Sequence, residues 1–456
     1  MSEHCGYVVK VEKLRPHTNA DKLQIATFFG NDTCVSLDTE LNEIGIYFPS
    51  DLQLSEEFCV ENHLCRKKPN GTPDTGYLEP DKRNIKAIKL RGEKSDGIFM
   101  PLSCLVYTGV NLSDINVGDT ITVVNGHEIC KKYIPRGRNR NNSAKGKGNK
   151  TRKKHAPVAP LFTEHADTEQ LAYNLGAFKP GDEIEITLKM HGTSQRTAYV
   201  PVLKGYKRTI WDKIFKREGT PIYDWDYVSG TRRTVLDDWD GGFYGSNAFR
   251  KQHHDKFVGK LLKGEEVYYE VVGFTDTGMP IMGKGNNKKL DKDFVKQYGE
   301  TTTFSYGCSC TGYYTYGDGS YDILPKSDLY VYRMTITNED GDVVEYSPDF
   351  MRYRCEQMGV KCVPEFVHVI LPNASYFDEN HTVGEYVKEM AEQYYDGPDP
   401  IGKTHVREGV VVRIINRPKF CAYKHKNFAF KCLEGLVKAE AEAPDMEEAE
   451  EEINNE

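Results

Sequence analysis

The sequence predicts an α+β protein with two folded parts, and three observations support that prediction. At 456 residues the chain is long enough for two or three domains, each with its own core. Short alternating apolar runs, typical of β-strands, outnumber the stretches with helical periodicity. A block rich in lysine and arginine, residues 131–154, divides the chain into a shorter first part and a longer second part.

Composition limits where the protein works. Hydrophobic residues make up 38% of the chain, and no apolar run approaches the roughly 20 residues of a membrane span. The first residues lack the basic-then-apolar pattern of a signal peptide. Twelve cysteines are scattered without a CxxC pair, which favours reduced thiols. We therefore expect a cytoplasmic protein, or a nuclear one in a eukaryote, that is not secreted and has no membrane partner.

The net charge of −8 hides two segregated blocks. Residues 439–456 hold nine acidic side chains and no basic one, so the rest of the chain carries +1. Residues 131–154 hold eleven Lys or Arg and no acid. Such blocks repel themselves and stay unfolded. The pattern predicts a basic flexible linker over 131–156, able to bind phosphates without regard to sequence, and an acidic disordered tail over 438–456.

Before the linker, alternating runs separated by Gly, Asn and Asp turns predict strands at Gly6–Val11, Thr33–Leu37 and Asp119–Val124. Together they indicate a small β-barrel over residues 1–130. After the linker, strands alternate with helices predicted at Phe350–Met358 and Thr382–Tyr394. The Tyr/Gly-rich stretch 301–321 is predicted to be a surface loop.

One segment stands out for chemistry. The run Glu183–Leu188 alternates so that Ile184, Ile186 and Leu188 share one face of a strand, and Lys189 follows on the polar face. Gly192 then supplies either a positive φ or the close backbone approach that a sharp turn needs. The arrangement presents one amine to a cleft.

Further segments follow Lys189 in an order that carries a resemblance. They are Ser229–Arg233, Val267–Gly273, Leu329–Met334, Arg407–Arg413 and Tyr423–Asn427. With Lys189–Ser194 this set resembles the motifs of ATP-dependent RNA ligases in the covalent nucleotidyltransferase superfamily. His191 and the K-x-K-N form at Lys424 agree with the RNA ligase 2 branch. Arg333 departs from the acid that usually follows the aromatic position.

The resemblance implies roles for individual residues. Lys189 would be the nucleophile that becomes bonded to AMP, and Lys424 and Lys426 would act on the triphosphate and make the amine more reactive. Glu270 and Glu408 would bind Mg²⁺ or Mn²⁺, and Glu270 could instead hold the ribose. The nucleotide, supplied as ATP, would contact a set of residues drawn from these motifs: Leu188, His191, Gly192, Arg232, Arg233, Glu270, Tyr332, Lys424 and Lys426.

The segments Val11–Leu23 and Ile88–Ile98 are similar to parts of tRNA-binding OB modules. The resemblance thus implies an OB-like nucleic-acid-binding barrel over 1–130. It also implies a nucleotidyltransferase domain of ATP-grasp-like antiparallel sheets with helices over 157–437. An N-terminal OB module is the Deinococcus-type arrangement of RNA ligases. The implied partner is RNA, with a nicked duplex or an RNA/DNA hybrid among the possible forms.

Two alternatives remain open at this point. A DNA ligase or a GTP-using capping guanylyltransferase would share the lysine motif, although those enzymes usually carry the OB domain after the K-x-K motif. A non-catalytic RNA-binding protein built on a decayed transferase domain would lose key side chains. Here Lys189, Glu270, Glu408, Lys424 and Lys426 are all present, which favours an enzyme.

Overall fold

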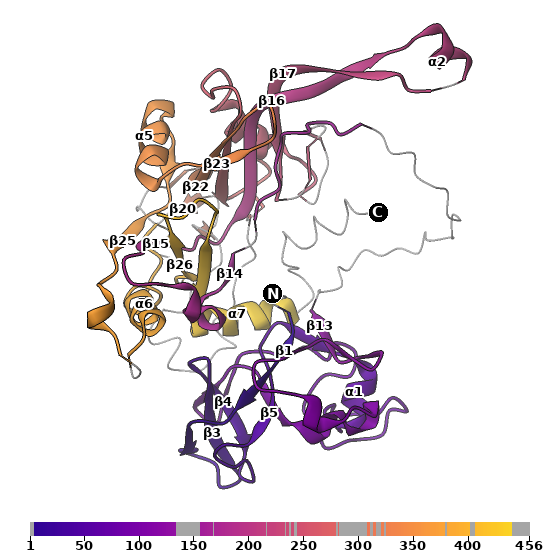
Figure 1. Ribbon diagram of the computed structural model, residues 1–456, viewed down its shortest axis with the longest axis vertical. Helices are drawn as coiled ribbons and strands as arrows, with labels where there is room; N and C mark the ends of the chain where they lie inside the picture. The colour runs from indigo at the N-terminus through magenta and orange to yellow at the C-terminus, as the bar shows by residue number, and fades with distance from the viewer. Residues whose placement is uncertain are drawn as a thin grey trace. The chain divides into compact units, whose positions relative to one another are not determined.

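The computed structural model of the chain describes residues 4–133, 156–166, 168–215, 217–232, 234–236, 239–240, 244–279, 281, 308–310, 313–315, 321–322, 325–378, 381–401 and 406–439. These residues form two compact units: 4–133 together with 428–439, and the described residues between 156 and 427 (Figure 1). The division differs from the predicted one because residues 428–437 join the first unit. The ends of the predicted linker and tail are also wrong, since residues 131–132 belong to strand β13 (Cys130–Lys132) and residues 438–439 to helix α7 (Phe428–Ala439). The predicted basic linker, apart from its first and last residues, and nearly all of the acidic tail lie outside the described residues.

The first unit is built from short antiparallel strands. A four-stranded sheet has the order β10-β1-β5-β9, and a three-stranded sheet has the order β2-β3-β4. Phe48, Phe58 and Leu105 lie at the centre of its core, fully buried. The elements are β1 Gly6–Lys10, β2 Leu14–Pro16, β3 Leu23–Phe28, β4 Asn31–Ser36, β5 Ile44–Phe48, β6 Leu52–Leu54, α1 Glu56–Glu61, β7 Ile88–Leu90, β8 Glu93–Ser95, β9 Ile98–Pro101, η1 Leu102–Thr108, η2 Leu112–Asp114, β10 Thr120–Ile121, β11 Val123–Val124, β12 His127–Glu128, β13 Cys130–Lys132 and α7 Phe428–Ala439.

The two segments that resemble OB modules lie together in this unit. Arg15 donates to Asp32 and to Glu93, at 3.0 and 2.8 Å, and so links the first segment to the second. Strands β7 and β8 form a hairpin whose turn residues Arg91 and Gly92 both have positive φ, as a two-residue turn of type I′ requires. The predicted strands at 6–11 and 33–37 are confirmed, whereas 119–124 is two short strands separated by Thr122.

Helix α7, at the C-terminal side of the chain, packs within the first unit. Phe430 on this helix is fully buried. Lys431 forms an ion pair of 2.6 Å with Asp96, which is itself 2% exposed. The Lys94 ammonium lies 5.4 Å from the centre of the Phe428 ring. The first unit is therefore completed by residues that follow the second unit in the sequence.

The second unit contains two larger sheets. One has five strands in the order β14-β27-β26-β15-β25, and the other has the path β17-β16-β18-β22-β23, with β24 beside β22. The elements are β14 Glu169–Gln170, η3 Leu171–Tyr173, η4 Leu175–Ala177, β15 Glu183–Leu188, β16 Thr193–Lys207, α2 Ile210–Ile214, β17 Thr220–Gly230, α3 Ala248–Asp255, β18 Glu265–Gly273, β19 Cys308–Cys310, β20 Tyr313–Thr315, β21 Tyr321–Asp322, β22 Ser327–Thr337, β23 Val343–Glu345, α5 Pro348–Met358, β24 Lys361–Cys362, β25 Glu365–Ile370, η6 Ala374–Tyr376, α6 Val383–Glu392, β26 Gly409–Ile414 and β27 Ala422–Lys426.

The predicted helices are confirmed as α5 and α6. Thr382 caps α6 in a capping box with Glu385, and its apolar face packs on the five-stranded sheet through the buried Val387. The prediction of a surface loop over 301–321 is wrong where the chain is described, because β19, β20 and β21 form a small antiparallel sheet there. Its Tyr and Thr residues suit strands as well as loops. No helix in the described part of the chain is long and apolar enough to cross a membrane.

Candidate active site

The candidate nucleophile lies where the chain passes from one sheet to the other. Strand β15 ends at Leu188, and β16 of the second sheet begins at Thr193. Ile184, Ile186 and Leu188 are buried on one face of β15, as predicted. Lys189 still pairs with the neighbouring strand, because its backbone N–H donates to the Gly409 carbonyl at 3.0 Å. The connection of four residues thus holds Lys189 at the edge of both sheets.

A single carboxylate joins two of the predicted lysines. Glu408 Oε1 lies 2.8 Å from Lys189 Nζ and 3.4 Å from Lys426 Nζ. Its Oε2 lies 3.2 Å from His191 Nδ1. The Glu408 side chain is only 4% exposed, while that of Lys189 is 23% exposed. These four residues, Lys189, His191, Glu408 and Lys426, are called the Glu408 cluster below.

The cluster keeps its carboxylate ionised. Burial by itself would raise the pKa of Glu408, but Lys189, Lys426 and the contact with His191 together hold that pKa well below its usual range. Glu408 is therefore a fixed negative charge at neutral pH. Glu408 pairs with two lysines, so one ammonium group still balances its negative charge when the other lysine loses its proton.

Gly192 and Glu270 form the turn after the lysine. The Gly192 N–H donates to Glu270 Oε1 at 3.1 Å. Of the two predicted reasons for a glycine here, close approach is the one observed: a Cβ on Gly192 would lie 2.4 Å from the Val271 carbonyl oxygen. Glu270 stands opposite Ser194 across β16 and β18. The turn therefore lies directly against the strand that carries Glu270.

A β-bulge places the predicted aromatic residue. On β22, Arg333 pairs with Tyr268 and Val331 pairs with Tyr269, which leaves Tyr332 as the extra residue. Bulges bend a strand locally and redirect a side chain. The Tyr332 hydroxyl lies 3.0 Å from the Ser194 hydroxyl. The bulge thus brings Tyr332 to the same edge as Lys189.

A cavity opens beside these residues. Leu188, Lys189, Arg232, Glu270 and Tyr332, all predicted, line it. Its walls combine apolar surface with cationic and aromatic side chains, which suits a flat ring joined to phosphates. The other lining residues are His165, Thr168, Glu185, Thr187, Met190, Ser194, Val363, Val411, Arg413, Phe420 and Ala422.

His165 is a site residue that the sequence did not reveal. Its ring packs against those of Tyr332, Tyr268 and Phe420, at 5.2, 5.4 and 6.2 Å between centroids. Burial, and then the nearby arginines 232, 333 and 196, lower the pKa of His165 well below its usual value. The residue belongs to no motif, so only the three-dimensional structure could reveal this neutral imidazole.

Arg333, which departs from the family pattern, has a structural partner. It is 6% exposed and pairs with Glu345 at 3.0 Å. Its guanidinium lies between two rings, 4.6 Å from the centroid of Tyr268 and 4.4 Å from that of Phe420. The cation therefore supports the aromatic wall of the cavity.

Five predicted site residues in the described part of the chain do not line the cavity: His191, Gly192, Glu408, Lys424 and Lys426. Lys424 and Lys426 share one face of β27, opposite Val411 and Gly409, and Lys426 contacts Glu408. His191 contacts Glu408 instead of lining the cavity. Arg233 lies outside the described residues. Lys426 and His191 thus contact Glu408, which in turn contacts Lys189 at the cavity.

The residues fit a divalent metal only in part. Within the described residues, no three His, Cys, Asp or Glu side chains gather as a metal group. Mg²⁺ is often held by one or two carboxylates with phosphate oxygens and waters, which needs no such group. Glu270 faces the cavity and fits that role. Glu408 already contacts two ammonium groups and an imidazole, so it fits the predicted metal role less well.

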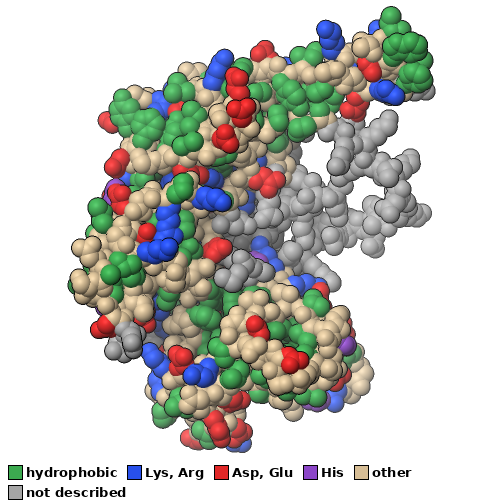
Figure 2. Space-filling view, viewed as in Figure 1, with side chains coloured by type: hydrophobic (Ala, Val, Ile, Leu, Met, Phe, Trp, Pro, Cys, Tyr) green, Lys and Arg blue, Asp and Glu red, His purple; other side chains and the backbone are tan. Residues whose placement is uncertain are grey.

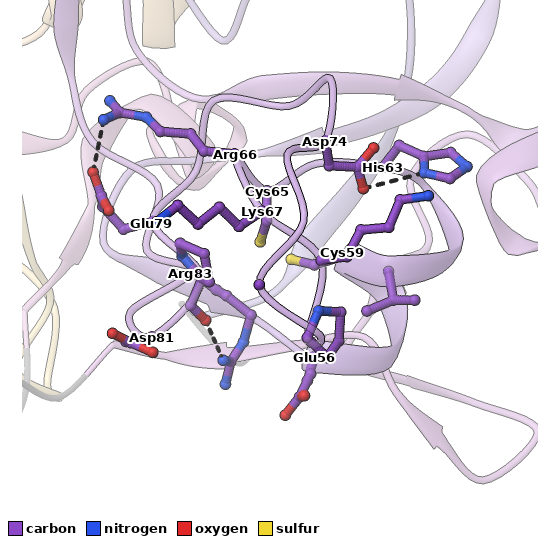
Figure 3. A pocket seen from close by; sticks show the side chains of 15 residues that line it. Glu56, Cys59, His63, Cys65, Arg66, Lys67, Asp74, Glu79, Asp81 and Arg83 are labelled. Carbon is purple, nitrogen blue, oxygen red and sulfur yellow. Dashed lines mark hydrogen bonds and ion pairs between the residues drawn. The ribbon is translucent and has the colours of Figure 1, made fainter.

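The first unit has a cavity of its own, of about 700 Å³. Figure 3 shows His63 turned toward Asp74 and Arg66 turned toward Glu79, at 3.2 and 2.9 Å. These charged side chains are paired across the cavity wall. Its lining comes from residues 56–83 and includes no predicted site residue.

Comparisons with known proteins bear on the fold. No protein-family model and no curated protein matches the sequence. Among solved structures, Naegleria gruberi RNA ligase with AMP and Mn is 14% identical, with a TM-score of 0.52, covering 94% of this chain and 98% of that one. The same ligase with pyrophosphate gives the same values. Its complex with ATP and Mn is 15% identical, with a TM-score of 0.51 and coverage of 93% and 96%. The chain therefore shares the mixed α/β, largely antiparallel fold of an RNA ligase over nearly its whole length.

Proposed function

We propose that this protein is an ATP-dependent RNA ligase that joins a 3′-hydroxyl end to a 5′-phosphate end through a lysyl-AMP intermediate. The observation that carries the proposal is the Glu408 cluster beside the cavity. It places a lysine at a sheet edge, fixes it with a buried carboxylate and adds a second lysine. The shared fold with a ligase solved with ATP, AMP and pyrophosphate supports the same reading.

The proposed first step forms the covalent intermediate. Neutral Lys189 Nζ attacks the α-phosphorus of ATP, a P–N bond forms, and pyrophosphate leaves with the electrons of the broken P–O bond. When Lys189 gives up its proton, Lys426 still balances the charge of Glu408. Lys424, on the same face of β27, is suited to meet the departing phosphates. A Mg²⁺ or Mn²⁺ near Glu270 would add positive charge against the triphosphate.

The proposed later steps use the same pocket. An RNA 5′-phosphate oxygen attacks the lysyl-AMP, which gives an adenylated end and returns Lys189. The 3′-hydroxyl then attacks the adenylated phosphate, and AMP leaves. Tyr332 and the apolar wall that includes Leu188 would hold the adenine, and Arg232 would contact ribose or phosphate. Such transfers depend chiefly on positioning and charge neutralisation.

The remaining assignments are part of the proposal. The first unit is an OB-like module that binds nucleic acid, supported by the contact between its two motif segments. The second unit is the nucleotidyltransferase domain, and the rest of the predicted linker and tail, beyond β13 and α7, keeps those roles. The partner is RNA, with a nicked duplex, an RNA/DNA hybrid and single-stranded ends among the possible forms, and the protein works in the cytoplasm or nucleus.

A labelling experiment tests the proposal. The protein is incubated with α-labelled ATP and Mg²⁺ or Mn²⁺, denatured and examined for covalent label. We expect label with ATP and complete loss of label in Lys189→Ala. Lys361→Ala is a matched control, because this lysine pairs with Asp328 and does not line the cavity. Label retained by Lys189→Ala would refute the proposal.

Two further readouts separate the alternatives. Labelling by GTP alone would indicate a capping enzyme. Equal sealing of all-DNA nicks and of nicks with RNA at the 3′-hydroxyl end would refute the assignment to RNA.

A further inference from the structure

The second unit carries a long two-stranded arm. Strands β16 and β17 pair from Arg196–Gly230 out to Lys207–Thr220, with a bulge between Leu203 and Gly205. The short helix α2 lies at the tip, and Figure 1 shows the arm projecting beyond the rest of its unit. A hairpin that extends past its sheet exposes both of its faces unless something covers them. The proposed ligation chemistry does not use this arm.

One face of the arm is aromatic. Cross-strand pairing puts Tyr199 opposite Tyr227, Pro201 opposite Trp225 and Leu203 opposite Tyr223, so these side chains share a face. The rings of Tyr199 and Tyr227 are stacked at 4.6 Å, and that of Trp225 lies 5.7 Å from Tyr199. All four aromatic side chains are half-buried. They form a row that leads from the sheet toward the tip.

The acids of the arm strands lie on the opposite face. Asp224 and Asp226 alternate with the aromatic residues of β17, so they point away from the aromatic row. Asp226 is also paired there with Lys204. A cation stands on the aromatic side instead: the Lys263 ammonium lies 4.9 Å from the centre of the Trp225 ring. The two faces therefore differ in charge.

The tip of the arm also carries exposed aromatic side chains. Trp211 and Phe215 are 66% and 60% exposed, and their rings are stacked at 6.0 Å with an angle of 17°. Ile210 and Ile214 are exposed beside them, and Figure 2 shows hydrophobic side chains gathered at this tip. A cluster of exposed apolar side chains of this kind is typical of an interaction surface.

Basic side chains surround the tip. Lys207, Arg208, Lys213 and Arg217 lie within it, against two acids, Asp212 and Glu218. The Asp212 carboxylate is occupied in the capping box of Thr209, where it accepts from the Thr209 N–H at 2.8 Å. The Arg217 guanidinium lies 5.5 Å from the Phe215 ring. The tip therefore offers positive charge beside aromatic faces.

From this arrangement we propose that the arm binds single-stranded RNA, with bases stacked on Trp211, Phe215 and the aromatic row of β17. Single-strand binding sites combine aromatic rings, on which any base can stack, with cations that follow the phosphates. The aromatic face of the arm, with Asp224 and Asp226 on the opposite face and with lysine and arginine beside its rings, meets both requirements. The inference rests on the proposed function, and it assigns the RNA flanking the joined ends to this arm.

The test uses the full chain and a fluorescein-labelled single-stranded 20-mer RNA, with binding followed by anisotropy at low and moderate salt. Trp211→Ala/Phe215→Ala should weaken binding about tenfold or more, since base stacking contributes roughly 1–3 kcal/mol per base. Phe350→Ala/Tyr353→Ala is the matched control, because that pair is also exposed and stacked but lies on α5. The control should bind as the wild type does.

Fluorescence gives a direct readout of stacking. The chain has three tryptophans, so Trp225→Phe/Trp239→Phe leaves Trp211 as the single reporter. RNA should quench its emission, and an abasic strand of equal length should quench it far less. Equal quenching by the abasic strand, or unchanged RNA affinity in the tip variant, would overturn the proposal. Binding of the tip to anionic phosphatidylserine vesicles, with RNA affinity unchanged, would assign it to a lipid surface instead.

The adenylation assay keeps the two proposals apart. The tip variant should still take covalent label from ATP, since no tip residue lies in the cavity. Normal label with unchanged RNA affinity would remove the arm's role and leave the ligase proposal intact. If the wild-type protein takes no label but the tip variant still binds RNA more weakly, the ligase proposal fails and the arm keeps its role in RNA binding.

Discussion

The Glu408 cluster and the tip of the β16–β17 arm differ in whether their charged side chains are buried and paired or exposed to solvent. In the cluster a carboxylate that is 4% exposed meets two lysines and a histidine, so its negative charge is compensated inside the protein. At the tip, Trp211 and Phe215 face solvent at 66% and 60% exposure beside basic side chains. The first region should contribute to stability as well as chemistry. The second should contribute to binding while adding little to stability.

The largest effect is expected from Glu408→Gln. Removing one partner of a buried ion pair leaves the others uncompensated, which typically costs about 3 kcal/mol or more. The variant should unfold at a clearly lower temperature and lose labelling by ATP, because Lys189 loses the group that positions it. Thermal unfolding and the labelling assay check both effects.

Glu265→Gln is the matched control for that variant. Glu265 is fully buried and pairs with Arg354 at 2.7 Å, but it does not line the cavity. We expect a comparable loss of stability with labelling retained well below the unfolding temperature. If both variants lose labelling equally, the role of Glu408 is structural and the contrast between the two regions weakens.

A smaller effect is expected from Gly192→Ala. The added Cβ would lie 2.4 Å from a backbone oxygen, which cannot move away like a flexible side chain. Strain of this kind typically costs about 1–3 kcal/mol. Gly176→Ala is the control, since a Cβ there meets no atom within 4 Å and φ is not positive. Equal unfolding temperatures for the two variants would contradict the close approach at the turn.

Lowering the pH should remove the contribution of Glu408 to the stability of the folded protein. Because its pKa is lowered in the folded protein, its stabilisation is fully present above the unfolded value near 4.3 and is lost as the pH falls below it. Each unit of lowering corresponds to about 1.4 kcal/mol. The difference in unfolding temperature between wild type and Glu408→Gln should stay constant from pH 7 to about 5 and narrow below pH 4.5. If that difference in unfolding temperature instead widens as the pH falls, the pKa of Glu408 is raised on folding and the assignment is wrong.

The smallest effect concerns the tip. Trp211→Ala/Phe215→Ala should change the free energy of unfolding by only about 0.5 kcal/mol, since exposed side chains away from packed features seldom matter more. Chemical denaturation measures this change. A loss of several kcal/mol would mean that the tip is packed in solution, and the contrast with the Glu408 cluster would disappear.

The sequence predicted local features well and long-range ones poorly. The burial of Ile184, Ile186 and Leu188 and the position of Lys189 follow from strand alternation, which is a local rule. Glu185 shows where that rule fails: it was predicted on a polar face but is 3% exposed, because Arg352 on α5 covers it in an ion pair. Alternation does not say what packs on the second face of a central strand.

The site illustrates the same limit. Glu408 meets Lys189 only because β26 lies beside β15, although more than 200 residues separate the two strands along the chain. The bulge that redirects Tyr332 depends on the register with β18, and His165 reaches the cavity from a segment without periodic pattern. These features depend on which strands pair in the folded protein. The order of the motifs indicated that they belong to one site, but it did not show which side chains would meet.

Helix α7 has a consequence for how the chain is made. The first unit draws its core from residues 4–133 and from α7, which is synthesised after the whole second unit. Domains tend to fold as they emerge from the ribosome, N-terminal parts first. Until α7 has been synthesised, Asp96 lacks Lys431 and the site of Phe430 is uncovered. A fragment ending at residue 133 would lack both contacts, so we expect it to be less stable than the unit completed by α7.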